Sequence, residues 1–211
     1  IALVDGGTIK VEKSEEALEG KTVTINGGNL DLTANNDGIN AADGSSSKKT
    51  PGQATAGVSL TITGGKIKIN AQGDGLDSNG DLTISGGEVY VDGPTNGGNG
   101  ALDYDGNGTI TGGTVVMVGS NGMAMGFGSN SKQASILTNV SGNAGAKVTI
   151  SDSSGKEILS YTAAKNCQSV LASSAAIKDG KSYTITVNGQ STTAIASLTT
   201  QNANGMGGGR K

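Results

Sequence analysis

Pairs of adjacent glycines recur along the first half of the chain, and each pair opens a short alternation of apolar and polar residues. The spacings between successive pairs are 21, 37, 22 and 26 residues. A period in the twenties with short strands is typical of a repeat protein, in which each unit buries its apolar face against its neighbours. The runs are GGTIKV at 6–11, GGNLDL at 27–32, GGKIKI at 64–69, GGEVYV at 86–91 and GGTVVMV at 112–118.

The one long spacing, 37 residues, becomes similar to the others if residues 44–57 are an inserted loop. Their sequence, GSSSKKTPGQATAG, has the Ser, Lys, Pro and Gly content of a loop. A second run precedes most of the pairs, as in DLTISGG at 81–87, and it repeats in the same register. Because side chains alternate across a strand, each register position predicts an inward or an outward column. The predicted inward columns are Ile25, Ile62, Ile84 and Ile110; Ile9, Leu30, Ile67, Val89 and Val115; and Leu18, Ile39, Leu76 and Leu102.

Three short strands and their turns consume about twenty residues, which is one turn of a parallel β-solenoid. The 37 glycines and the Val, Ile and Thr content favour β structure over helix. We therefore predict an all-β protein: a right-handed parallel β-helix, a solenoid with coils of about 21–26 residues over residues 1–129. From about residue 130 the alternations lengthen, which predicts an antiparallel β cap over 130–200, followed by a Gly-rich tail at 201–211.

Composition excludes several classes of function. The net charge of −3 and a single arginine, Arg210, argue against a nucleic-acid surface. No apolar stretch approaches the length of a membrane span, so no membrane insertion is expected. With no histidine, a Ser/His/Asp triad and a His-held zinc are excluded. Cys167 is alone and is expected in the core, and a chain beginning at Ile1 in apolar alternation is expected to lack any signal peptide.

Acidic residues recur around the third apolar column. The aligned segments are EEALEG at 15–20, NDGINA at 36–41, GDGLDS at 73–78 and NGALDY at 99–104. The residue after each inward Leu or Ile must point outward, and neighbouring strands lie about 4.8 Å apart, so the carboxylates would stack. Like charges opposite one another destabilise a sheet, and a cation between the strands removes this repulsion.

Oxygen ligands without His or Cys favour Ca²⁺, which accepts six to eight oxygens, over zinc, copper or iron, and Mg²⁺ fits less well. We predict two or three Ca²⁺ ions. The alternative is that these acids only cap turns beside glycines. The candidate ligands are Glu16 and Glu19 with Asp37 and Asn40; Asp37 and Asn40 with Asp74, Asp77 and Asp43; and Asp77 with Asn79, Asp103 and Asp105.

These motifs resemble a family of bacterial cell-surface carbohydrate-binding proteins with a calcium-bearing, polysaccharide-lyase-like parallel β-helix. The resemblance rests on NDGINA, QGDGLDSNGDLTISGG, GNGALDYDGNGTITGG and SNGMAM, followed by KSYTITVNG and a glycine-methionine tail. It implies secretion to the cell surface, calcium between the coils, and binding of plant cell-wall polysaccharides such as cellulose and acidic, pectin-like sugars.

Three functions follow from these observations. The first is calcium-dependent polysaccharide binding without cleavage, with Tyr90, Lys66 and Lys68 as candidate sugar contacts. The second is a structural surface module or adhesin that calcium stiffens. The third is a calcium-dependent pectate lyase, which would need Arg or Lys as the base that removes the proton α to a uronate carboxylate.

Overall fold

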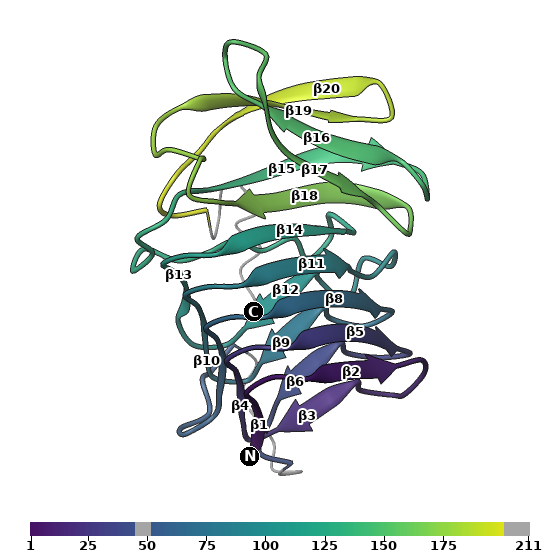
Figure 1. Ribbon diagram of the computed structural model, residues 1–211, viewed down its shortest axis with the longest axis vertical. Helices are drawn as coiled ribbons and strands as arrows, with labels where there is room; N and C mark the ends of the chain where they lie inside the picture. Colours follow the sequence, from purple (N-terminus) through teal and green to yellow (C-terminus); the bar gives the residue numbers. More distant parts are fainter. Residues whose placement is uncertain (45–51, 201–211) are drawn as a thin grey trace.

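The computed structural model describes residues 1–44 and 52–200, and all of its regular secondary structure is β (Figure 1). Three sheets stack strands from successive repeats. The first contains β1 (Ala2–Val4), β4 (Thr22–Ile25), β7 (Ser59–Ile62), β10 (Asp81–Ile84) and β13 (Gly108–Ile110), all parallel. The second, also parallel, contains β3 (Leu18–Gly20), β6 (Ile39–Ala41), β9 (Leu76–Ser78) and β12 (Leu102–Tyr104).

The third is a seven-stranded sheet that mixes both directions. Its parallel strands are β2 (Thr8–Val11), β5 (Asn29–Ala34), β8 (Lys66–Ala71), β11 (Glu88–Asp92) and β14 (Thr114–Gly119). Two antiparallel strands, β18 (Cys167–Ser173) and β15 (Ser135–Gly142), continue it beyond β14.

A four-stranded antiparallel sheet lies at the top of Figure 1. Its order is β17 (Glu157–Thr162), β16 (Lys147–Ser151), β19 (Ser182–Val187) and β20 (Gln190–Ile195). One apolar core fills the space between the three sheets of the repeats, and a second core lies between this sheet and the strands β15 and β18. Cys167 is buried in the second core, as predicted.

The predicted registers of the apolar columns are confirmed. Ile25 pairs with Ile62, which pairs with Ile84, and Leu76 pairs with both Ile39 and Leu102. The second glycine of each pair has a positive φ, for example 90° at Gly65, a conformation that L-residues with a Cβ rarely adopt. The glycine pairs therefore place a tight turn at the same point of every repeat.

The predicted right-handed parallel β-helix is wrong, although the all-β class is confirmed. The strands form several sheets, parallel and antiparallel, and do not form a single solenoid closed by a separate cap. The physical reason is that a glycine-pair period encodes the pairing of one repeat with the next. This period carries no information on which strand pairs with the free edge of β14. In the structure, antiparallel β18 pairs with that edge, and antiparallel β15 pairs with β18 in the same sheet.

The predicted division of the chain near residue 130 stays a prediction. Part of the predicted inserted loop and the whole predicted tail, residues 45–51 and 201–211, lie outside the described residues. In the described ranges there is no helix long and apolar enough to cross a bilayer.

Candidate metal centre and a second surface

The outward residues of the β3–β6–β9–β12 sheet form one column across four repeats. Glu19 pairs with Asn40, Asn40 with Asp77, and Asp77 with Asp103. Each follows an apolar residue that points into the core, so the alternation of the strand turns the polar side chain outward. Sequence and register together place Asp77 and Asp103 side by side on adjacent strands.

In the second and third repeats of this motif, a glycine immediately before the apolar residue leaves no room for a side chain. A Cβ on Gly75 would overlap the side chain of Val91 and the carbonyl of Ala101, and a Cβ on Gly38 would overlap Ile69. The Gly38 N–H donates to the Asp74 carbonyl at 2.9 Å, so successive repeats are in backbone contact at this point. This close approach brings the acid before each glycine up to the next repeat.

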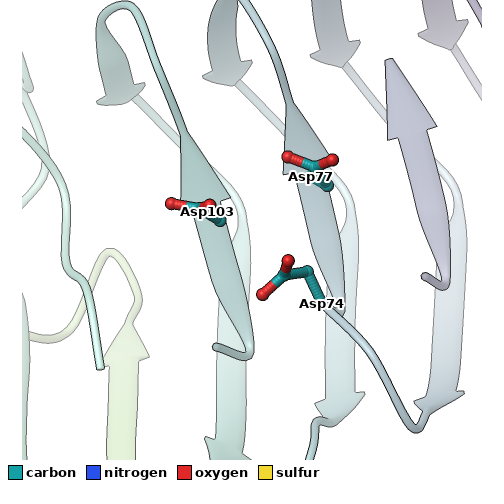
Figure 2. Close-up of side chains that lie close together, drawn as sticks. All are labelled: Asp74, Asp77 and Asp103. Carbon is teal, nitrogen blue, oxygen red and sulfur yellow. The ribbon is translucent and has the colours of Figure 1, made fainter. Parts of the chain in front are cut away.

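Three carboxylates meet in the acidic cluster, which consists of Asp74, Asp77 and Asp103. Each offers an oxygen, and these oxygens all lie within 4.8 Å of one another. Figure 2 shows Asp77 and Asp103 on adjacent strands, with Asp74 on the segment that leads into the strand of Asp77 and its carboxylate turned toward the gap between the strands. All three are partly buried.

Backbone N–H groups hold two carboxylates of this strip in place. Asp37 Oδ1 accepts a hydrogen bond from the N–H of Asp74 at 2.7 Å, and Asp74 Oδ1 accepts one from the N–H of Gly100 at 2.6 Å. The same contact thus repeats between successive units. Each carboxylate is fixed by the unit that follows it.

Burial raises the pKa of three of these acids. The pKa of Asp77 rises to about 8 and that of Asp74 to about 7, because burial disfavours the charged form and neighbouring carboxylates add repulsion. Burial also raises the pKa of Asp37, against a hydrogen bond from Asp74 that lowers it. Without a counter-charge the cluster is an unfavourable concentration of negative charge.

A buried amide oxygen gives an independent test of whether a metal ion fits. Asn40 is 9 % exposed, and its Nδ2 donates to Glu16 Oε2 at 2.7 Å. Its Oδ1 is buried and has no hydrogen-bond partner among the described residues. Carboxylate and amide oxygens are the ligands that Ca²⁺ takes in proteins, so the donors at Asp37, Asn40 and the acidic cluster fit such an ion.

The other predicted ligands lie along the same strip but outside the acidic cluster. Glu16 is bonded to Asn40, and Glu19 is exposed on β3. Asp43 and Asn79 are partly buried just after β6 and β9, and Asp105 is partly buried just after β12. In the described part of the chain, one cluster of three acidic side chains could therefore hold a metal ion, and the predicted number of two or three ions stays a prediction.

The predicted sugar contacts lie on a different sheet. Lys66, Lys68 and Tyr90 stand on the outer face of β8 and β11 in the seven-stranded sheet. There they line a hollow of about 410 Å³, called here the lysine–tyrosine groove, with residues of β16 and β17. The sequence does not predict that β16 and β17 line this groove, because the glycine-pair period stops before them and no motif links them to β8 and β11. The added lining residues are Lys147, Ser160, Tyr161 and Thr162.

Tyr90 and Tyr104 differ in their exposure to solvent. Tyr104 is buried, 4 % exposed, and its hydroxyl donates to the Gly126 carbonyl at 2.7 Å. A Cβ at Gly108 would overlap its ring, so this glycine makes room for it. Tyr90 remains at the surface, which leaves it as the candidate for contact with a ligand.

A family model described as carbohydrate-binding domain-containing protein matches residues 2–204. The match spans the repeats, the acidic cluster, the groove and the C-terminal antiparallel sheet. No curated protein and no solved structure gives a significant match to the chain.

Proposed function

Because the chain belongs to the family of carbohydrate-binding domain-containing proteins, we propose that it binds plant cell-wall polysaccharide outside the bacterial cell and does not cleave it. The observation that carries the proposal is the family match over residues 2–204. Cellulose and acidic, pectin-like sugars are the proposed ligands.

The proposal includes a Ca²⁺ ion at the acidic cluster. Asp74, Asp77 and Asp103 would hold it, with oxygens of Asp37 and Asn40 close by in the same strip. When bound, the ion neutralises the buried carboxylates and offers a positive charge that attracts a uronate carboxylate. The backbone N–H groups of Asp74 and Gly100 hold the carboxylates of Asp37 and Asp74, so the acids of neighbouring repeats stay at a fixed separation.

Binding without cleavage is supported by where Lys66 and Lys68 lie. A lyase of this kind needs a basic side chain next to the metal-bound uronate. Lys66 and Lys68 project from the seven-stranded sheet, whereas the acidic cluster belongs to the β9–β12 sheet. Lys48, Lys49 and the lone arginine, Arg210, lie outside the described residues.

A second candidate function is a calcium-stiffened surface module. It is favoured by the position of the acidic cluster across two repeats, where an ion would link β9 to β12. Such a module would have no affinity for sugar chains, and this separates it from the proposed function.

Co-sedimentation with insoluble polysaccharide tests the proposal. Purified protein is mixed with cellulose or with insoluble polygalacturonate, in calcium and in chelator, and the pellet and supernatant are compared. We expect the protein in the pellet in calcium. Protein that stays in the supernatant with every polymer would instead indicate the structural module, and release of unsaturated oligosaccharides from polygalacturonate would indicate a lyase.

A further inference from the structure

The lysine–tyrosine groove is formed by two segments far apart in sequence. Its floor consists of Lys66, Lys68 and Tyr90 on β8 and β11. Its wall consists of Lys147 on β16 and of Tyr161 with its neighbours on β17. The volume of about 410 Å³ lies within the range of about 300–1,000 Å³ of pockets that bind small ligands.

A buried aspartate fixes the wall against the floor. Asp92, fully buried at the end of β11, accepts hydrogen bonds from the Tyr161 hydroxyl at 2.6 Å and from the Ala164 N–H at 2.7 Å. The ammonium of Lys165 donates to the carbonyl of Ala71 at the end of β8. These contacts join the β16–β17 hairpin and the residues just after it to the seven-stranded sheet, so the groove exists before any ligand binds.

The two tyrosines of the groove stack on each other. The ring centroids of Tyr90 and Tyr161 are 5.4 Å apart and the ring planes are inclined by 8°. Both side chains are partly exposed. A stacked pair anchored by the hydrogen bond of Tyr161 to Asp92 presents a rigid apolar surface, against which the C–H face of a sugar ring packs without ordering the side chains first.

The charge of the groove is supplied by three lysines. Lys66 Nζ lies 3.9 Å from Glu88 Oε2, and Lys147 Nζ lies 3.1 Å from Glu157 Oε2. Both ion pairs are exposed to solvent. Exposed pairs of this kind contribute little, so these ammonium groups can exchange their partner for a ligand carboxylate at small cost. Lys68 has Asp31 and Tyr90 as its cross-strand neighbours, and within the described residues no carboxylate lies within 4.0 Å of its ammonium group.

We propose that the lysine–tyrosine groove is a binding site for an anionic polysaccharide, whose carboxylates pair with Lys66, Lys68 and Lys147 and whose sugar rings pack against Tyr90 and Tyr161. This rests on the proposed function for the choice of a carbohydrate ligand. The groove is a separate site from the acidic cluster, because it lies on another sheet. It would also recognise carboxylates without a metal ion.

The test compares two double variants that remove the same charge. Lys68→Gln with Lys147→Gln alters the groove, and Lys13→Gln with Lys181→Gln alters two exposed lysines outside it. Affinity for soluble polygalacturonate is measured in calcium and in chelator, after circular dichroism has shown each sample to be folded. We expect the groove variant to bind about 10-fold more weakly than wild type in both buffers, and the control variant to stay within about twofold.

A polymer control and an aromatic control sharpen the result. Carboxyl-reduced polygalacturonate, which has lost its charges, is expected to show no difference between the two variants. Tyr90→Ala is expected to weaken binding about as much as the lysine changes, whereas Tyr90→Phe keeps the ring and most of the affinity.

Two failures can be told apart. If wild type binds polygalacturonate but the groove variant binds as tightly as the control variant, the groove is not the site and the proposed function stands. If wild type binds no polysaccharide in either buffer, the proposed function fails together with this inference.

Discussion

The acidic cluster and the lysine–tyrosine groove lie on different sheets of one molecule and are assembled in different ways. The cluster repeats one short motif on neighbouring strands, so Asp77 meets Asp103 through the register of β9 with β12. The groove joins β8 and β11 to a hairpin more than fifty residues further along the chain, and it depends on the contacts of Asp92. Repetition gathers like charges, whereas long-range docking can bring aromatic rings and cations together.

Removing the Asp92 carboxylate should have the largest effect on stability and, of the two sites, should disturb the groove directly. Asp92→Ala leaves the Tyr161 hydroxyl and the Ala164 N–H without their buried partner, and removes a negative charge that stabilises the ammonium of Lys165. We expect the free energy of unfolding to fall by about 3 kcal/mol, measured by urea denaturation. Calcium binding at the acidic cluster should persist in whatever fraction stays folded.

A matched control is Asp179→Ala. Asp179 is exposed and accepts one hydrogen bond from the N–H of Leu198 at 3.1 Å. Its removal should cost less than about 1 kcal/mol. Equal losses for the two variants would contradict the role assigned to Asp92.

Adding a methyl group at Gly75 should damage the acidic cluster in preference to the groove. Gly75→Ala places a Cβ against the Ala101 carbonyl and the Val91 side chain, so the strand that carries Asp77 must shift. We expect a loss of about 2 kcal/mol in the free energy of unfolding. Gly97→Ala, with no atom within 4 Å of the new Cβ, is the control and should be nearly neutral.

The stability of the metal-free protein should depend on pH through the acidic cluster. Asp77 and Asp74 have pKa values raised to about 8 and about 7 in the folded state, against an ordinary value of 3.8. The folded state therefore holds protons that the unfolded state has released, so stability is lost as pH rises from about 5 to about 8. In chelator we expect the melting temperature to fall by a few degrees across this window.

Two comparisons show whether this dependence of the melting temperature on pH comes from the acidic cluster. Saturating calcium should remove it, because the ion replaces the protons as counter-charge. Asp77→Asn should reduce it in chelator, because the group with the higher pKa is gone. A melting temperature that rises through the same window in chelator would show that the raised pKa values are wrong.

Local features of the fold could be predicted from the sequence. The alternation around each glycine pair fixes which residues are inside, and Leu76 pairs with Leu102 as predicted because a one-residue slip would expose the whole column. The same register gave Asp77 and Asp103 as neighbours. That Asp74 joins them also follows from its glycine, since Gly75 allows the close approach.

Other features carry no sequence signal. The change from parallel to antiparallel pairing at β14 depends on the contact with β18, which comes about fifty residues later in the chain. Tyr161 and Lys147 join Tyr90 and Lys68 only after the β16–β17 hairpin packs on the sheet, and a lone Asp92 in a strand gives no indication of its two hydrogen-bond partners. The fold class was therefore wrong beyond the all-β level, and half of the groove was missed.

The most direct test of the acidic cluster is a calorimetric titration of the metal-free protein with calcium, for wild type and for Asp77→Asn at the same pH. Removing one of three carboxylates whose oxygens lie within 4.8 Å of one another should abolish or strongly weaken a saturable binding event that wild type shows. Absence of calcium binding in wild type, or identical isotherms for the two proteins, would contradict a metal ion at Asp74, Asp77 and Asp103.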